Sequence, residues 1–269
     1  MLGAIFGDVV GSVYEFDNIK TKDFPLFKQG CGYTDDSVMT VATAEALMRF
    51  AEVADVDAFK QALIEAYHKY GNNYPYAGYG IRFFKWLATR STEPYGSYGN
   101  GSAMRVSPVA WYATSLEEAI SLARASAEIT HDHPEGIKGA VVTAGATYLA
   151  RTGESKDTIR AFAERFYDMS FTLDEIRPTY FFNETCQDTV PQAIEAFLES
   201  ESFEDAIRNG ISLGGDSDTL CAITGAVAEG YYGMSDAERG AALSHLDEPM
   251  RRVTIDFLSR VGSIKEGGA

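Results

Sequence analysis

Apolar residues recur every three or four positions along most of the chain, which is the spacing of one buried face of an α-helix. The stretch 56–70 shows this pattern through Ala58, Leu63, Ile64 and Tyr67. Alternating apolar and polar runs, which would indicate strands, are scarce. The spacing predicts helices near 3–15, 36–53, 56–70, 79–89, 116–129, 135–151, 156–169, 188–200, 203–211, 217–232, 236–244 and 248–261. We therefore expect an all-α fold of about a dozen helices.

Local signals support several of these helices and also mark the interruptions between them. Three pairs have the capping-box spacing of a Ser or Thr followed by a Glu three residues later. They are Ser115–Glu118, Thr172–Glu175 and Ser235–Glu238. Two Gly- and Tyr-rich stretches, 70–80 and 92–105, interrupt the helical pattern, and loops of this length in a compact domain are usually functional. Because no linker or repeat is present, we expect one domain over 1–269.

Composition narrows the class of protein. The 269 residues are 45% hydrophobic and 23% charged, as in ordinary globular proteins that fold without disulfides. The chain carries 23 basic and 39 acidic residues, a net charge of −16, which argues against general nucleic-acid binding and against docking on anionic membranes. Cys31, Cys186 and Cys221 form no CxxC pair, which indicates free thiols. With no signal-peptide pattern at the N-terminus, we expect a cytoplasmic monomer.

The first candidate site lies in the N-terminal segment. Gly3, Gly7 and Gly11 are spaced four apart, so another backbone or a ligand can approach that helical face closely. On the predicted helix 3–15 the spacing of Asp8 and Glu15 points both carboxylates the same way. The alternative interpretation is close helix packing beside two surface acids.

Two further clusters precede predicted helices, and each combines two carboxylates with a Thr hydroxyl. Their residues are Thr34, Asp35 and Asp36 in one and Asp216, Asp218 and Thr219 in the other. N-capping would explain either cluster alone, but a cap needs only one side-chain oxygen. Four carboxylates brought together would repel one another unless a cation lay between them. Oxygen ligands select a hard ion such as Mg²⁺, Mn²⁺ or Ca²⁺ rather than zinc.

A third pattern suits an anionic nucleotide. The segment 95–105 combines closely spaced glycines, whose backbone N–H groups can converge on a pyrophosphate, with tyrosines that can stack on a base. A flexible surface loop is the alternative. Arg105, backbone amides and metal ions can offset the acidic field of the protein at such a site. We expect His131 to be a hydrogen-bonding residue of the same cleft rather than a helix-terminal histidine.

Taken in order, these segments resemble the ADP-ribosylglycohydrolase family of ADP-ribosyl-acceptor hydrolases, which includes the dinitrogenase-reductase-activating glycohydrolases. The matching segments are 7–15 (GDVVGSVYE), 34–37 (TDDS), 96–105 (GSYGNGSAMR), 130–131 (TH) and 214–219 (GGDSDT). The resemblance implies a compact all-α fold with two Mg²⁺ or Mn²⁺ ions in a cleft. It also implies hydrolysis of the bond between C1″ of ADP-ribose and an acceptor side chain. Ser37 stands where the family commonly has Thr.

The resemblance further implies a role for each matching position. The implied metal ligands, with Asp218 bridging the two ions, are Glu15, Thr34, Asp35, Asp36, Asp216, Asp218 and Thr219. The residues implied to act on water or the leaving group are Glu15 and Asp35. The implied substrate-binding residues are Tyr95, Gly96, Ser97, Tyr98, Gly99, Asn100, Gly101, Met104 and His131.

The implied substrate is an ADP-ribosylated protein or an ADP-ribose derivative. The GSYGNG form is closer to the branch that acts on serine-linked and O-acetyl-ADP-ribose than to the arginine-specific branch. Two other functions stay open, because one fold can serve several chemistries. One is a non-catalytic ADP-ribose-binding module, and the other is a metal-dependent hydrolase of another nucleotide or phosphoester.

Overall fold

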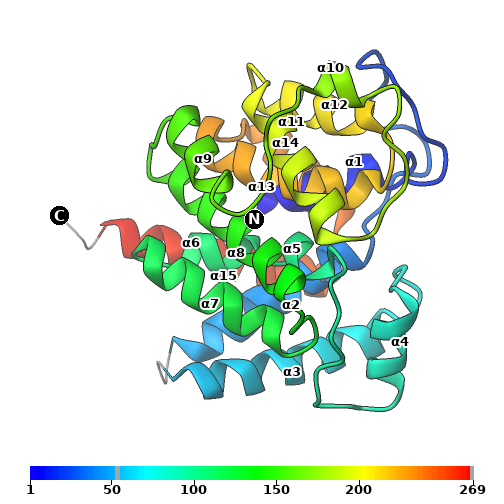
Figure 1. The fold of residues 1–269 in the computed structure, drawn as a ribbon. Helices are drawn as coiled ribbons and strands as arrows, with labels where there is room; N and C mark the ends of the chain where they lie inside the picture. Colours follow the sequence, from blue (N-terminus) through cyan, green and yellow to red (C-terminus); the bar gives the residue numbers. More distant parts are fainter. Residues whose placement is uncertain (52–54, 267–269) are drawn as a thin grey trace.

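The computed structural model describes residues 1–51 and 55–266, and the regular structure in these ranges is helical (Figure 1). The α-helices are α1 (Leu2–Gly11), α2 (Asp35–Phe50), α3 (Val56–Asn73), α4 (Ile81–Ala88), α5 (Gly101–Met104), α6 (Ser107–Tyr112), α7 (Leu116–Glu128), α8 (Pro134–Arg151), α9 (Lys156–Ala163), α10 (Leu173–Ile176), α11 (Val190–Leu198), α12 (Phe203–Leu213), α13 (Ser217–Tyr232), α14 (Asp236–His245) and α15 (Glu248–Glu266). One 3₁₀ turn, η1 (Cys186–Asp188), precedes α11. Within the described ranges no strand forms, and one isolated bridge joins Gly99 to Thr185. The all-α prediction is confirmed.

Helices α1 and α13 pack against each other in the middle of the molecule, with α10–α12 on one side and α2–α4 on the other (Figure 1). Every residue of α1 is buried. The glycine spacing explains this packing, because a Cβ on Gly3 would overlap the carbonyl of Gly225 and a Cβ on Gly7 would overlap that of Cys221. Most buried apolar side chains belong to one cluster around this pair. The close packing brings the ends of α1 and α13 together, and the candidate site lies there.

Several helix ends differ from the prediction. The helix predicted over 3–15 ends at Gly11, and the one over 156–169 ends at Ala163. Beyond Ala163 the Asp168 carboxylate accepts from the backbone N–H of Ser170, a local bond that competes with the helix. Pro191 has no N–H and lies in the first turn of α11, so the helix predicted over 188–200 begins only at Val190. The short helices α5, α6 and α10 were not predicted, and positions 52–53 of the helix predicted over 36–53 lie outside the described residues.

The capping predictions are confirmed in two of the three cases. Thr172–Glu175 and Ser235–Glu238 form complete capping boxes. Ser115 accepts from the backbone of Glu118, but the Glu118 carboxylate bonds to the backbone and hydroxyl of Thr114 instead. The three cysteines are free thiols, as expected. In the part of the chain that the structure describes, no helix combines the length and apolar character needed to cross a membrane.

Candidate metal centre and substrate cavity

The first acidic cluster lies at the start of α2, where the capping is done by a hydroxyl. Thr34 is the N-cap residue, and its Oγ1 accepts from the backbone N–H of Asp36 at 3.3 Å. The carboxylates of Asp35 and Asp36 therefore remain free for another role. Asp36 is buried, and its Oδ2 has no hydrogen-bond partner. A buried carboxylate oxygen without a donor is costly, so this atom calls for a proton or a cation.

Asp8 on α1 fixes this turn from behind. Its carboxylate accepts from the backbone N–H of Thr34 at 3.0 Å and of Ser37 at 3.0 Å, and also from both hydroxyls. Asp8 is fully buried, so its interpretation as a surface acid is wrong. The glycines at positions 7 and 11 are the sequence signal for this burial, because they mark the face of α1 that lies against other backbone. Asp8 is a supporting residue that the site prediction did not include.

The second acidic cluster lies at the start of α13, where Oδ1 of Asp218 accepts from the backbone N–H of Thr219 at 3.0 Å. Asp216 occupies the N-cap position without a side-chain capping bond. Its Oδ2 instead accepts from Nδ2 of Asn100 at 2.7 Å. Thr219 donates from Oγ1 to Oδ1 of Asp36 at 3.3 Å, which joins the two acidic clusters directly. Capping alone therefore does not explain either cluster.

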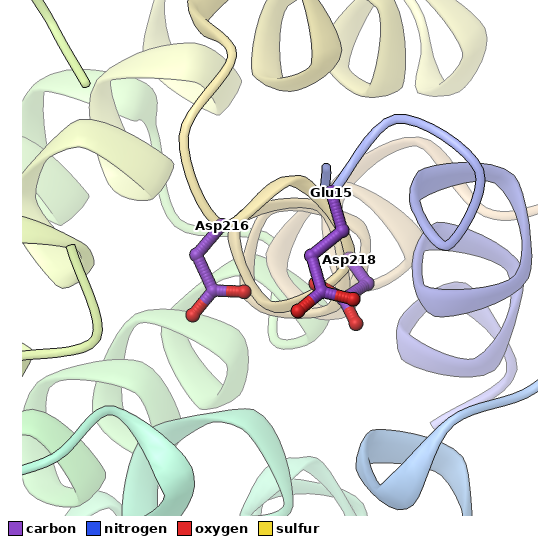
Figure 2. A group of neighbouring side chains, drawn as sticks. All are labelled: Glu15, Asp216 and Asp218. Atoms are coloured by element: carbon purple, nitrogen blue, oxygen red, sulfur yellow. The ribbon is translucent and has the colours of Figure 1, made fainter. Parts of the chain in front are cut away.

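Glu15 reaches the same place from a turn and not from a helix. Because α1 ends at Gly11, the prediction that Asp8 and Glu15 share a helical face is wrong. Asn18 holds the turn, since its Nδ2 donates to the carbonyls of Tyr14, Glu15 and Gly215. Ligand oxygens of Glu15, Asp216 and Asp218 lie within 4.8 Å of one another and point into one space (Figure 2).

The carboxylates of this cluster lack neutralising partners. In the described part of the chain no ion pair joins Glu15, Asp35, Asp36, Asp216 or Asp218 to a basic group. Burial raises the pKa of Glu15 to about 8 and that of Asp216 to about 6. Burial, followed by the charges of neighbouring carboxylates, raises the pKa of Asp35, Asp36 and Asp218 well above the usual range. A hard divalent cation would neutralise this cluster with the oxygen ligands that such ions prefer.

The acidic cluster forms one end of a cavity of about 630 Å³. The cavity is lined by all the predicted site residues except Thr34 and Gly96. The Thr34 hydroxyl donates to Asp8, and the Gly96 backbone N–H donates to Asp132 at 2.6 Å. The structure thus gathers the acidic cluster and the Gly-rich segment around a single space, although Asp216 and Tyr95 are about 120 residues apart in the sequence.

The Gly-rich segment 95–101 also lines the cavity, and Asn100 joins it to the acidic cluster through Asp216. Asn100 donates its backbone N–H to the carbonyl of Glu184 at 2.8 Å, and Cys186 donates to the carbonyl of Tyr98 at 3.0 Å. Residues 184–186 thereby support the segment through backbone bonds. The 101–104 part of this predicted loop is the short helix α5.

Several residues that line the cavity were missed by sequence reasoning. They are Phe16, Arg82, Phe182 and Glu184, among others. Phe16 is 84% exposed and stacks on Phe182 with ring centroids 5.9 Å apart. No local pattern marks Phe16, Phe182 and Glu184, because they lie in loops without periodicity, and Arg82 is one of several exposed positions of α4. Only the fold brings residues 16 and 182 together.

The sequence was compared with known proteins. The pattern of the family described as ADP-ribosylglycohydrolase matches residues 1–255. ADP-ribosylhydrolase ARH3 of Bos taurus is 27% identical, with 87% of this chain and 84% of that protein covered. ADP-ribosyl-[dinitrogen reductase] glycohydrolase of Rhodospirillum rubrum is 26% identical over 93% and 90% of the two chains. ADP-ribosylarginine hydrolase Tri1 of Pseudomonas putida (strain GB-1) is 27% identical over 87% and 70%.

The fold was also compared with solved structures. A chain titled ADP-ribosylglycohydrolase-related protein complex superposes with a TM-score of 0.67, at 24% sequence identity and with 95% of both chains covered. This similarity supports the same arrangement of helices.

Proposed function

Because the chain belongs to the ADP-ribosylglycohydrolase family, we propose that it is a metal-dependent hydrolase that removes ADP-ribose from modified acceptor side chains. The observation that carries this proposal is the convergence of unneutralised carboxylates in a cavity that the Gly-rich segment also lines. We further propose serine-linked or O-acetyl-ADP-ribose as the preferred substrate over arginine-linked ADP-ribose. The GSYGNG form of residues 96–101 supports this preference.

The carboxylates of the cluster fit a hard divalent cation, and we propose two Mg²⁺ or Mn²⁺ ions. The unpartnered Oδ2 of Asp36 and the carboxylates without a basic partner supply the donor set such ions need. We propose Thr34, Asp35 and Asp36 for one ion and Asp216, Asp218 and Thr219 for the other, with Glu15 beside them. A bound ion would supply a fixed positive charge that orients the ribose hydroxyls and a water molecule.

The chain's own residues would handle the protons. Water attacks C1″ as the bond from C1″ to the acceptor oxygen breaks, and the proton that the water loses ends on the acceptor oxygen. Glu15 or Asp35 accepts the proton from the attacking water as general base. Positive charge develops at C1″ in such reactions, and the nearby carboxylates would stabilise it.

The diphosphate and the adenosine would lie along the Gly-rich segment. Arg82 is exposed, lines the cavity and donates to the carbonyl of Tyr95, whereas the guanidinium of Arg105 is buried over the rings of Tyr67 and Phe83. Arg82 would therefore bring positive charge to the phosphate oxygens. Such a charge offsets the net charge of −16 at the place where an anionic substrate must bind.

The proposal is tested by the products released from two ADP-ribosylated peptides, one Ser-linked and one Arg-linked. Each is incubated with Mg²⁺, with Mn²⁺ or with a chelator. We expect free ADP-ribose from the Ser-linked peptide, in the presence of metal only. Tight ADP-ribose binding without any release would indicate a binding module, and an altered nucleotide would indicate a different scissile bond.

A further inference from the structure

His131 presents one edge of its ring to the cavity and the other to the protein. It follows α7, and its backbone N–H donates to the carbonyl of Ala127 at 2.7 Å. Its Nδ1 lies 2.8 Å from Oγ1 of Thr130. Its Nε2 faces the Gly-rich segment, where a Cβ placed on Gly101 would lie 3.1 Å away. The ring is only 4% exposed and lines the cavity, so Nε2 is available to a bound ligand.

Arg105 stands behind this histidine and is an unusual residue for a core. It is 1% exposed, and its guanidinium lies over the ring of Tyr67 at 4.5 Å and that of Phe83 at 5.5 Å. Its NH2 group donates to Oγ1 of Thr130 at 2.7 Å. Within the described residues no carboxylate pairs with it. Its one hydrogen bond to a side chain is therefore directed at the hydroxyl that contacts His131.

The direction of these hydrogen bonds follows from which of the three side chains can donate and which can accept. A guanidinium has only donors, so Thr130 must accept from Arg105. The Thr130 hydroxyl is fully buried and keeps one hydrogen, for which Nδ1 of His131 is the acceptor within reach. If Nδ1 instead carried the hydrogen, the Thr130 hydroxyl would be buried without an acceptor, which is unfavourable. Nδ1 is thus the acceptor, and the hydrogen of the imidazole lies on Nε2.

We propose that Arg105 and Thr130 are positioning residues that hold His131 as its Nε2–H tautomer, so that it donates a hydrogen bond to an oxygen of the bound ADP-ribosyl group. The ligand in this inference rests on the proposed function, whereas the tautomer rests on the hydrogen bonds alone. Neither Arg105 nor Thr130 needs to touch the substrate in this arrangement.

The electrostatic surroundings agree with a neutral ring. Burial, followed by the charges of Arg105 and Arg82, holds the pKa of His131 well below its usual range. An uncharged imidazole whose Nδ1 already accepts a bond has a single donor left, and that donor faces the cavity. The groups packed around it also limit its movement, because the backbone N–H of Tyr95 donates to the carbonyl of Thr130 at 3.4 Å.

The test compares Thr130→Val, which removes the hydroxyl but keeps the shape, with Thr130→Ser, which restores the hydroxyl. Thr143→Val is the matched control, because Thr143 is another buried threonine and its hydroxyl has no partner. Long-range ¹H–¹⁵N correlation spectra of ¹⁵N-histidine-labelled protein near neutral pH report the tautomer. The signals of His131 among the four histidines are assigned with a His131→Gln variant. ADP-ribose affinity is measured by calorimetry with Mg²⁺ present.

We expect an Nε2–H signal pattern for His131 in the wild type, in Thr130→Ser and in Thr143→Val, and a changed pattern in Thr130→Val. We also expect Thr130→Val to bind ADP-ribose ~10-fold more weakly, with affinity within ~2-fold of wild type in the other two variants. An Nδ1–H or doubly protonated ring in the wild type would overturn the inference, as would wild-type affinity in Thr130→Val. Failure of the wild type to bind ADP-ribose would overturn the proposed function and the ligand named here, while the spectra would still decide the tautomer.

Discussion

Asp218 illustrates how a single residue can serve function at the expense of stability. Its carboxylate is buried beside Asp216, and burial together with that charge raises its pKa well above the usual range. In a metal-free protein such a group opposes folding, because its charged form is neither solvated nor paired. With a cation bound as we propose, the same group would be a ligand. The two effects have opposite signs, so they can be separated by experiment.

For Asp218→Asn we therefore predict a metal-free protein at least as stable as the wild type near neutral pH. The same variant should lose at least ~100-fold in metal affinity and in hydrolysis rate, because a ligand charge is removed. Chemical denaturation and calorimetric Mg²⁺ titration measure the two effects. Asp23→Asn, at an exposed carboxylate outside the cluster, is the control and should change neither. Wild-type turnover in Asp218→Asn with both metals retained would contradict the proposed site.

Asp8 differs from Asp218 because its carboxylate is stabilised by hydrogen bonds. It accepts from backbone N–H and hydroxyl groups of Thr34 and Ser37. Asparagine at position 8 would place its side-chain NH₂ group against some of those donors. Because an NH₂ group cannot accept, those hydrogen bonds would be lost. In saturating Mg²⁺ we expect Asp8→Asn to lower the free energy of unfolding by about 1–3 kcal/mol. Metal affinity should fall as well, because the turn that presents Asp35 and Asp36 loosens. Unchanged stability and metal affinity would show that Asp8 does not position this turn.

At the scale of elements, the site depends on how closely α1 approaches α13. Gly7 lies against the backbone of Cys221, so a methyl group there would have to push the two helices apart. Overpacking in a core costs about 1–3 kcal/mol, and more when backbone must move. We expect Gly7→Ala to destabilise the protein by at least this amount. Gly240→Ala in α14 is the control, because a Cβ there meets nothing within 4 Å and alanine favours a helix by about 1 kcal/mol. Equal stability of the two variants would refute the role of this packing.

Much of the helical content is local information and could be predicted from the sequence. The boxes at Thr172 and Ser235 are examples, since the bonds that start each helix join residues three apart. The end of α1 could not be predicted in this way. Positions 12–15 continue the helical pattern, but Asn18 bonds to Gly215 and the chain turns away. The end of α1 therefore depends on a contact between two residues that are nearly two hundred positions apart in the sequence.

At the scale of the molecule, the structure joins acidic clusters that the sequence shows only separately. The bond from Thr219 to Asp36 spans 183 residues, and residue spacing carries no information about it. That these carboxylates belong to a site was still predictable, because four carboxylates at two helix starts exceed what capping requires, and the metal itself stays a prediction. The wall formed by Phe16, Phe182 and Glu184 was not predictable, since those residues lie in loops without any pattern. The single domain over 1–269 stays a prediction.

The cluster also predicts how stability changes with pH. The pKa of Glu15 is raised from 4.5 to about 8 and that of Asp216 from 3.8 to about 6. Between each ordinary value and the raised value the folded protein holds more protons than the unfolded chain, so its stability falls as pH rises. We expect metal-free protein to melt a few degrees lower at pH 8 than at pH 6. Mg²⁺ should raise the melting temperature more at pH 8, where fewer protons compete for the ligands.

Differential scanning calorimetry with and without chelator measures this dependence. The samples without Mg²⁺ should contain enough Na⁺ to match the ionic strength of the samples with Mg²⁺, so that screening of the net charge stays constant. A metal-free protein that is more stable at pH 8 than at pH 6 would contradict the raised carboxylate pKa values.

The central claim is that water cleaves the bond at C1″ with the help of metal held by the acidic cluster. The most direct measurement is mass spectrometry of both products after hydrolysis of the Ser-linked peptide in H₂¹⁸O, with Mg²⁺ or with chelator. We predict Mg²⁺-dependent release in which ADP-ribose gains the ¹⁸O and the serine of the peptide keeps its original oxygen. Label in the peptide, or release that is equally fast with chelator, would contradict the account.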